Sequence, residues 1–204
     1  MEVLELKPLK KKVTAFMFAK DNSEKLQNSS SESLIHFLKE KKINFLTIDF
    51  DIDIEKFRKT EFTKTLERLG IKYYQLDIPE YPMAYIYQEI LEKEEILKEL
   101  IEEYKSLDDR ESYKALSLKN WIDLINIEIQ EKEVSLSLTL RPLWIVKKML
   151  DLIRECAEEE VSFVHIVQTD ICEEICPQIV KNLRELNAKV IQYNKKHTIK
   201  NIII

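Results

Sequence analysis

Short apolar runs alternate along this chain with longer segments in which apolar residues recur every three or four positions. The runs are rich in β-branched and aromatic residues, as in strands that are covered on both faces. They span residues 12–19, 43–50, 71–78, 161–167 and 189–193, with 198–204 as a candidate sixth. The longer segments predict helices at 29–41, 54–69 and 177–186. Because strand–helix–strand order is typical of right-handed crossovers, the sequence predicts an α/β fold with three layers and a mainly parallel, Rossmann-like sheet of five to six strands.

The middle of the chain has a different pattern, which predicts a block of helices after the third strand. Apolar residues recur there at helical spacing over residues 84–107, 111–131 and 143–157. In the second of these helices Leu124 and Ile127 lie off the main apolar stripe. The second helix is therefore expected to have apolar neighbours on two sides.

The predicted domains follow from this change of pattern. Residues 1–78 and 159–204 are expected to form two halves of one α/β domain, and residues 79–158 a mainly helical insertion. Within the insertion, residues 134–140 alternate apolar and hydroxyl side chains, which predicts a strand or an extended connector. The insertion is expected to cover a face of the sheet, to cap the strand ends or to form a dimer interface.

Gly70 is the only glycine, whereas average usage of about 7% would give roughly fourteen. It follows the predicted helix 54–69, and Asn187 follows the predicted helix 177–186. Glycine and asparagine are the residues that most readily end a helix in the left-handed conformation. A Walker A loop and a G-x-G-x-x-G turn each need several glycines, so neither phosphate-binding loop is present.

Carboxylates follow several of the predicted strands and are the candidates for chemistry. Parallel sheets bind ligands beyond the carboxyl ends of their strands, where the sequence places Asp49, Asp51, Asp77 and Asp170. Oxygen ligands of this kind hold Mg²⁺ or Mn²⁺, and such a metal orients a phosphate and activates water. One interpretation is therefore a metal site at Asp49, Asp51, Asp77 and Asp170 with Asp49 and Asp51 as catalytic residues; the other is that these aspartates are solvated or cap helices, as expected for Asp53.

The cysteines and histidines suggest no further site. Cys172 and Cys176 precede the predicted helix at 177–186, and thiols at a helix N-terminus are more reactive. Their spacing is not the C-x-x-C of a dithiol motif, and half-buried thiols are the expectation. His165 lies inside the predicted strand 161–167 and is expected to be a hydrogen-bonded core residue.

Composition narrows the classes of partner. The formal net charge is −5, and the lysine-rich stretches are balanced by acidic runs. Broad nucleic-acid affinity relies on clustered Lys and Arg, so the charge does not support it, although it does not exclude it. No stretch reaches the roughly 18 apolar residues of a membrane span, and the N-terminal segment lacks the apolar core of a signal peptide. We expect a cytoplasmic protein without a membrane partner.

Two functions remain open from the sequence. The first is a non-enzymatic interaction or regulatory module that uses the helical insertion for dimerisation or for binding a protein partner. The alternative is a divalent-metal-dependent phosphoesterase or nuclease-like enzyme with its carboxylates at the edge of the sheet. The absence of a phosphate loop and of a nucleophile–base pair favours the first.

Overall fold

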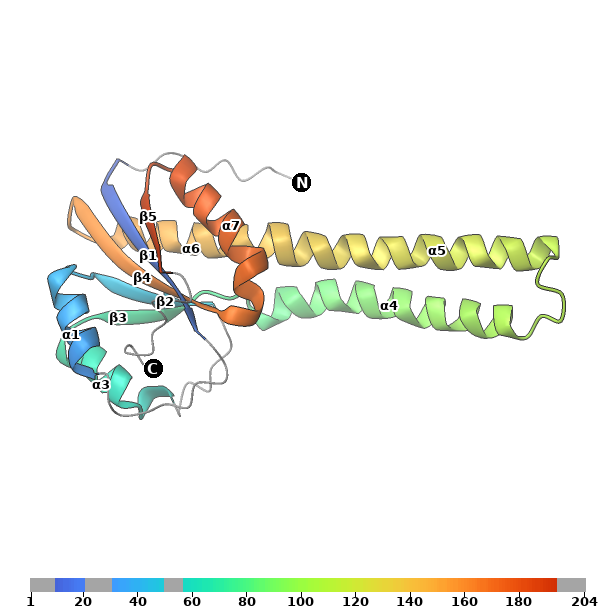
Figure 1. The fold of residues 1–204 in the computed structure, drawn as a ribbon, viewed down its shortest axis with the longest axis horizontal. Helices are drawn as coiled ribbons and strands as arrows, with labels where there is room; N and C mark the ends of the chain where they lie inside the picture. The colour runs from blue at the N-terminus through green and yellow to red at the C-terminus, as the bar shows by residue number, and fades with distance from the viewer. Residues whose placement is uncertain (1–9, 21–30, 50–56, 194–204) are drawn as a thin grey trace. The chain divides into compact units, whose positions relative to one another are not determined.

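The computed structural model describes residues 10–20, 31–49 and 57–193, and of residues 19–20, 31–35, 80–82, 168–172 and 193 it describes the backbone alone. These residues fall into two compact units (Figure 1). One unit combines Met1–Asp77 with Arg141–Ile204, and the other is Ile78–Leu140.

The first unit is built on a five-stranded sheet in which every pair of neighbours is parallel. Its strands are β1 (Lys12–Lys20), β2 (Phe45–Ile48), β3 (Lys72–Gln75), β4 (Glu160–Gln168) and β5 (Lys189–Tyr193), in the order β3-β2-β4-β1-β5. The prediction of an α/β fold with a parallel sheet is confirmed. The candidate sixth strand at 198–204 lies outside the described residues.

The two faces of this sheet carry separate hydrophobic cores, because successive side chains of a strand point to opposite faces. On β1, Ala15 and Met17 belong to one core, and Phe16 and Phe18 belong to the other. Buried side chains of α1 (Ser31–Glu40) and α3 (Glu61–Arg68) complete the Phe16 core. Buried side chains of α6 (Arg141–Glu155) and α7 (Thr169–Glu185) complete the Ala15 core.

On the two sides of β4 the chain leaves the strands towards different faces of the sheet. The chain leaves β1 and β2 towards the face of α1 and α3, and it leaves β4 towards the face of α7. Since β4 lies between β1 and β2, the outgoing connections diverge on both of its sides. In parallel sheets ligands bind in the crevice formed by such divergence at the carboxyl ends of the strands. A ligand site is therefore expected at the carboxyl edge of β2 and β4.

The predicted left-handed turns are both present. Gly70 has a φ of 68° and Asn187 a φ of 66°, each directly after a helix of the first unit. A Cβ added to Gly70 would meet no atom within 4 Å, so glycine is favoured here by its backbone conformation and not by lack of space. The described helix α3 begins after Thr60, whose hydroxyl accepts from the Thr63 amide; the predicted cap, Asp53, lies outside the described residues.

The second unit is a helical hairpin of α4 (Glu80–Lys105) and α5 (Tyr113–Val134), followed by η1 (Ser135–Leu140). The two long helices run antiparallel, since Lys93 pairs with Glu128 while Glu89, one turn earlier, pairs with Lys132, one turn later. Between the helices lie the buried residues Ile90, Leu100, Ala115, Leu118 and Ile129. This pairing holds the hairpin together along most of its length.

Three sequence predictions differ from the structure. Residues 135–140 form a π-helix and not a strand, because their unit contains helices alone and offers no strand for the ladder to pair with. Helix α7 begins at Thr169 and carries Pro177 in its interior, eight residues after its start. Helix α6 belongs to the α/β unit and not to the helical unit, since Ile145, Met149 and Ile153 are buried in the sheet's core.

Candidate functional site

A buried polar cluster lies at the carboxyl end of β2, on the face of the sheet covered by α6 and α7. Thr47 of β2 and His165 of β4 are partners in the strand register, and both are 0% exposed. The Thr47 hydroxyl lies 2.9 Å from His165 Nδ1 and 3.2 Å from the Val164 carbonyl oxygen. Asp49 follows β2 and is also fully buried, with Oδ2 at 3.8 Å from His165 Nε2. Three polar side chains are thus enclosed in an otherwise apolar core.

His165 is neutral in this setting. Burial lowers the pKa of His165 to about 3, since a charged ring loses its hydration there. Thr47 Oγ1 donates to the Val164 carbonyl oxygen and shares a hydrogen bond with His165 Nδ1, while Asp49 Oδ2 lies 3.8 Å from Nε2. The ring is fully buried and has no contact with solvent, so His165 is a residue of the sheet's core. The expectation of a hydrogen-bonded core histidine is confirmed.

Arg141, the first residue of α6, connects the ends of two strands. Its Nη2 donates to the Asp49 backbone oxygen at 2.7 Å and to Asp77 Oδ2 at 2.9 Å. Trp144, one turn further along α6, donates its indole N–H to the Asp77 backbone oxygen at 3.2 Å. The side chains of Arg141 and Asp77 are 19% and 27% exposed. This arginine was not singled out from the sequence, because nothing local relates it to aspartates 64 and 92 residues away.

The four predicted metal ligands differ in their surroundings and in how much of each the structure describes. Asp77 holds a guanidinium group, and Asp49 is buried beside a neutral histidine. Asp51 lies outside the described residues, and of Asp170 the backbone alone is described, as the second residue of α7. Within the described part of the chain no group of three or more His, Cys, Asp or Glu is placed to hold a metal ion. The Mg²⁺ or Mn²⁺ site therefore stays a prediction.

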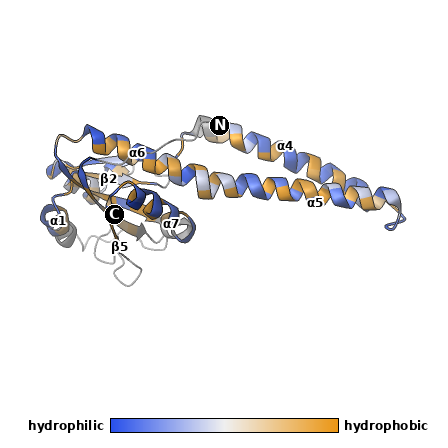
Figure 2. Ribbon diagram, turned by 90° about the horizontal axis from the view of Figure 1, so that it is seen from above, coloured by the Kyte–Doolittle hydropathy of each residue, from blue (hydrophilic) through white to orange (hydrophobic). Residues whose placement is uncertain are grey.

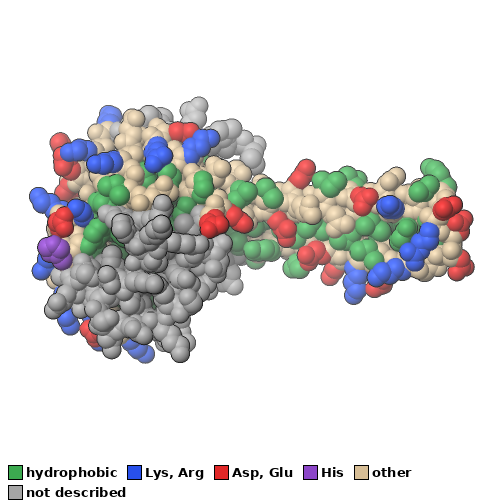
Figure 3. All heavy atoms as spheres, in the orientation of Figure 1, with side chains coloured by type: hydrophobic (Ala, Val, Ile, Leu, Met, Phe, Trp, Pro, Cys, Tyr) green, Lys and Arg blue, Asp and Glu red, His purple; other side chains and the backbone are tan. Residues whose placement is uncertain are grey.

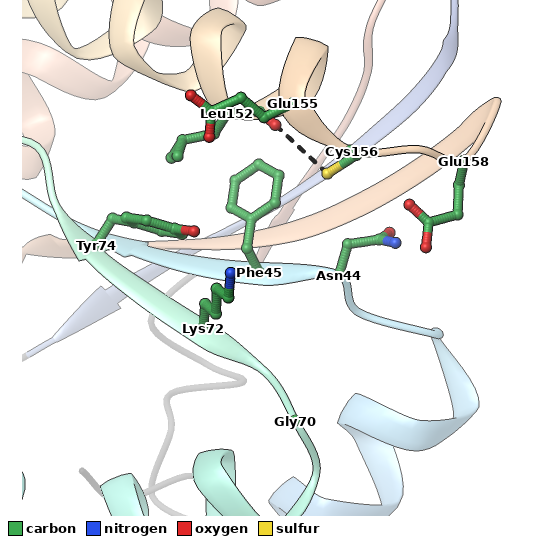
Figure 4. Close-up of a pocket in the computed structure, with 9 residues that line it drawn as sticks. All are labelled: Asn44, Phe45, Gly70, Lys72, Tyr74, Leu152, Glu155, Cys156 and Glu158. Atoms are coloured by element: carbon green, nitrogen blue, oxygen red, sulfur yellow. Dashed lines mark hydrogen bonds between the residues drawn. The ribbon is translucent and has the colours of Figure 1, made fainter.

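A pocket of about 270 Å³ opens at the other, amino-terminal edge of the sheet (Figure 4). Lys72 and Tyr74 of β3 line one side, and Glu155, Cys156 and Glu158 line the other. Burial and the neighbouring Glu158 raise the pKa of the Cys156 thiol, which also donates to the Leu152 carbonyl oxygen. The reactive form of cysteine is the thiolate, so this pocket holds no activated nucleophile. Cys176 is buried in the core, and the side chain of Cys172 is not described.

The helical hairpin exposes large apolar side chains, which the α/β unit does not do among its described residues. Figure 2 marks hydrophobic residues in orange along the ribbons of α4 and α5, and Figure 3 shows green hydrophobic side chains on the surface of the hairpin. The exposed set consists of Tyr85, Tyr87, Leu91 and Ile96 of α4 and Tyr113, Leu116, Trp121, Leu124, Ile127 and Val134 of α5. Soluble monomers rarely expose contiguous apolar patches of several hundred Å², and larger ones mark interaction sites.

Helix α5 has two apolar faces. Ala115, Leu118 and Ile129 face α4 and are buried. With 3.6 residues per turn, Tyr113, Leu116, Leu124, Ile127 and Val134 lie on the opposite face, where each is 52–88% exposed. We call these five residues the α5 stripe. The sequence had placed Leu124 and Ile127 off the main stripe, and the structure gives their face no neighbour within the described chain.

Comparison with known proteins adds no relative. No protein-family model matches the chain, and neither the curated proteins nor the solved structures contain a match. Among the described residues no helix is long and apolar enough to cross a membrane.

Proposed function

We propose that this protein is a non-enzymatic interaction or regulatory module. In this proposal the α/β unit is a three-layer, Rossmann-like scaffold in the cytoplasm, and the helices inserted after β3 bind a protein partner or a second copy. The observation that carries the proposal is the distribution of exposed apolar side chains. All ten large exposed ones found in the described chain lie in α4 and α5.

The α5 stripe has the composition of a binding surface. Burying a Val, Leu or Ile side chain contributes roughly 1.5 to 3 kcal/mol relative to leaving it in water. Tyr113 heads the stripe, and Trp121 lies at its flank with 63% of its surface exposed. Tyrosine and tryptophan are enriched among the residues that dominate binding energy at interfaces. A partner that covers this face therefore gains a large apolar contribution.

The polar groups at the sheet's carboxyl edge support the same choice over a phosphoesterase or nuclease-like enzyme. Asp77 is engaged by Arg141, and a guanidinium at 2.9 Å competes with any cation for that carboxylate. His165 is enclosed and neutral. These interactions join β2, β3, β4 and α6 to one another, which is a structural role.

Photo-crosslinking of the full chain in its native cell tests the proposal. A benzoylphenylalanine at position 124 or 127 should form adducts with another polypeptide. The matched control carries the same group at Lys181, an exposed position of α7, and should form none. Adducts from position 124 must also disappear in the Leu116→Lys variant, which disrupts the same stripe. Absence of any adduct from positions 124 and 127 would refute the proposal.

A further inference from the structure

We infer that the partner of the α5 stripe is a second copy of this chain, packed α5 against α5 in antiparallel orientation. This inference rests on the proposed function and specifies its partner. It is argued from the spacing of the stripe, from the positions of its polar residues and from the area it offers.

The stripe has the spacing of a coiled-coil seam. Tyr113, Leu116, Leu124, Ile127 and Val134 are joined on their face by two exposed polar residues, Asn120 and Glu131. The successive steps are of three or four residues and average 3.5 over Tyr113–Val134. A repeat of 3.5 residues keeps one face of a helix against a partner helix along its whole length. The expected occupant is therefore another long helix.

The polar positions make the stripe self-complementary. When two α5 helices pair antiparallel about a two-fold axis that passes between Ile125 and Asn126, Leu124 lies opposite Ile127. In the same register Asn120 lies opposite Glu131, and each of these pairs forms twice. The same surface on both subunits is what a two-fold dimer requires.

Two alternative arrangements lack this match. A parallel, in-register pair would bring the two copies of Glu131 together, with like-charge repulsion. A shift of one turn would set Glu131 or Asn120 against an apolar side chain, and burying a polar group without a partner is costly. A single polar residue in an apolar seam is a known device for fixing register.

The charges that remain on α5 fit this register as well. Lys93, Glu128, Glu89 and Lys132 are used within the hairpin. In the described structure Lys119 and Glu131 take part in no such ion pair. In the antiparallel pair Asn120 faces Glu131 of the other copy. Lys119, the residue before Asn120, therefore lies next to that glutamate. An ion pair on each side of the axis would then flank the apolar centre.

The area is sufficient for a weak dimer. Helix α5 has 22 residues and is about 33 Å long. In this register the two helices overlap over residues 117–134, so the buried apolar side chains are Leu124, Ile127 and Val134, with Leu116 at the end of the overlap. If each of these four buries roughly 100 Å², the two copies together bury about 800 Å², which is in the range of weak, transient interfaces. A weak association is therefore expected, with dimers at high and monomers at low concentration.

Sedimentation of the full chain between about 1 and 200 μM tests the inference. The wild type should change from monomer to dimer, and Leu124→Lys should weaken association at least tenfold while the far-ultraviolet circular dichroism stays unchanged. The matched control is Leu91→Lys, the same change at an exposed position of α4, which should dimerise as the wild type does. Glu131→Lys should weaken the dimer, and adding Lys119→Glu should restore it.

The outcomes separate this inference from the proposed function. A strict monomer that still forms stripe-dependent adducts with a different polypeptide overturns the second copy and leaves the function standing. A monomer without adducts overturns both. A dimer that Leu124→Lys does not weaken, or that Leu91→Lys weakens equally, overturns the inference because another surface then forms the contact. An adduct from position 124 that maps to residues 124–131 of a second copy supports the register.

Discussion

The two units of this protein differ in where their large apolar side chains lie. In the α/β unit the sheet is covered on one face by α1 and α3 and on the other by α6 and α7, and its described large apolar side chains are turned inward. In the helical unit α4 and α5 pack against each other, and ten large apolar side chains of the described residues remain in contact with solvent. A pair of helices can bury one stripe of each, so any second apolar stripe needs another partner.

The polar groups show the opposite contrast, since the α/β unit buries some of its own and the hairpin leaves its ion pairs partly exposed. The α/β unit encloses Thr47, Asp49 and His165 in its core, and all three are 0% exposed. In the hairpin the ion pairs Lys93–Glu128 and Lys132–Glu89 join the two helices, and their side chains stay 25–41% exposed. Exposed ion pairs contribute little to stability, whereas buried polar groups are costly to leave without partners. The two units should therefore respond differently to mutation and to pH.

The largest expected effect comes from removing one apolar side chain from each unit. Phe163 is 0% exposed and stacks on Phe45 with ring centroids 5.0 Å apart. Phe163→Ala should reduce the free energy of unfolding by about 3 to 5 kcal/mol. Leu124→Ala, on the exposed stripe, should change it by less than about 0.5 kcal/mol for the monomer. Urea unfolding at low micromolar concentration measures both, and equal losses would contradict the contrast between the units.

The second-largest expected loss of stability comes from removing the hydrogen bonds of Arg141 at the carboxyl edge of the sheet. Arg141→Gln removes the hydrogen bonds to Asp49 and Asp77 and should cost about 2 kcal/mol, because both groups are partly enclosed. Arg154→Gln, which changes the same side chain at a 57% exposed position, serves as the control and should cost less than about 0.5 kcal/mol. Similar melting temperatures for the two variants would show that Arg141 does not stabilise the sheet.

The smallest expected effect is a difference between the two units in how their stability depends on pH. The pKa of His165 is lowered to about 3 in the folded chain, so only the unfolded chain binds a proton as pH falls below its ordinary value of 6.5. The α/β unit should therefore lose about 1.6 kcal/mol between pH 6.5 and pH 5. Lys132 holds the pKa of Glu89 in the hairpin below its usual range. Its contribution is present above the ordinary pKa of about 4.5 and is lost only as pH falls through the folded value.

Trp144 fluorescence in a Trp121→Phe chain reports on the α/β unit and measures this difference. Urea unfolding of that chain should show the loss between pH 6.5 and pH 5. His165→Gln should remove most of the pH dependence in this window, even if the variant is less stable throughout. An undiminished slope in His165→Gln would assign the effect to another group.

Local residue patterns predict most of the elements and their local geometry. Strand and helix periods located the five strands of the sheet, and the residue types at Gly70 and Asn187 identified two left-handed turns. The second apolar face of α5 was also visible, in Leu124 and Ile127. These features depend on backbone conformation and on side-chain spacing within one element, which neighbouring residues specify.

Which elements lie next to one another follows from the packing of the whole fold. The order β3-β2-β4-β1-β5 places Thr47 beside His165, 118 residues away, and the packing of α6 brings Arg141 to Asp77. The tertiary structure also shows that 135–140 continue in a helix, because no strand of their own unit is present to pair with them. Such contacts are selected by the packing of whole faces and by the need to satisfy buried polar groups. Neither condition is expressed in the local pattern of residues that forms each element.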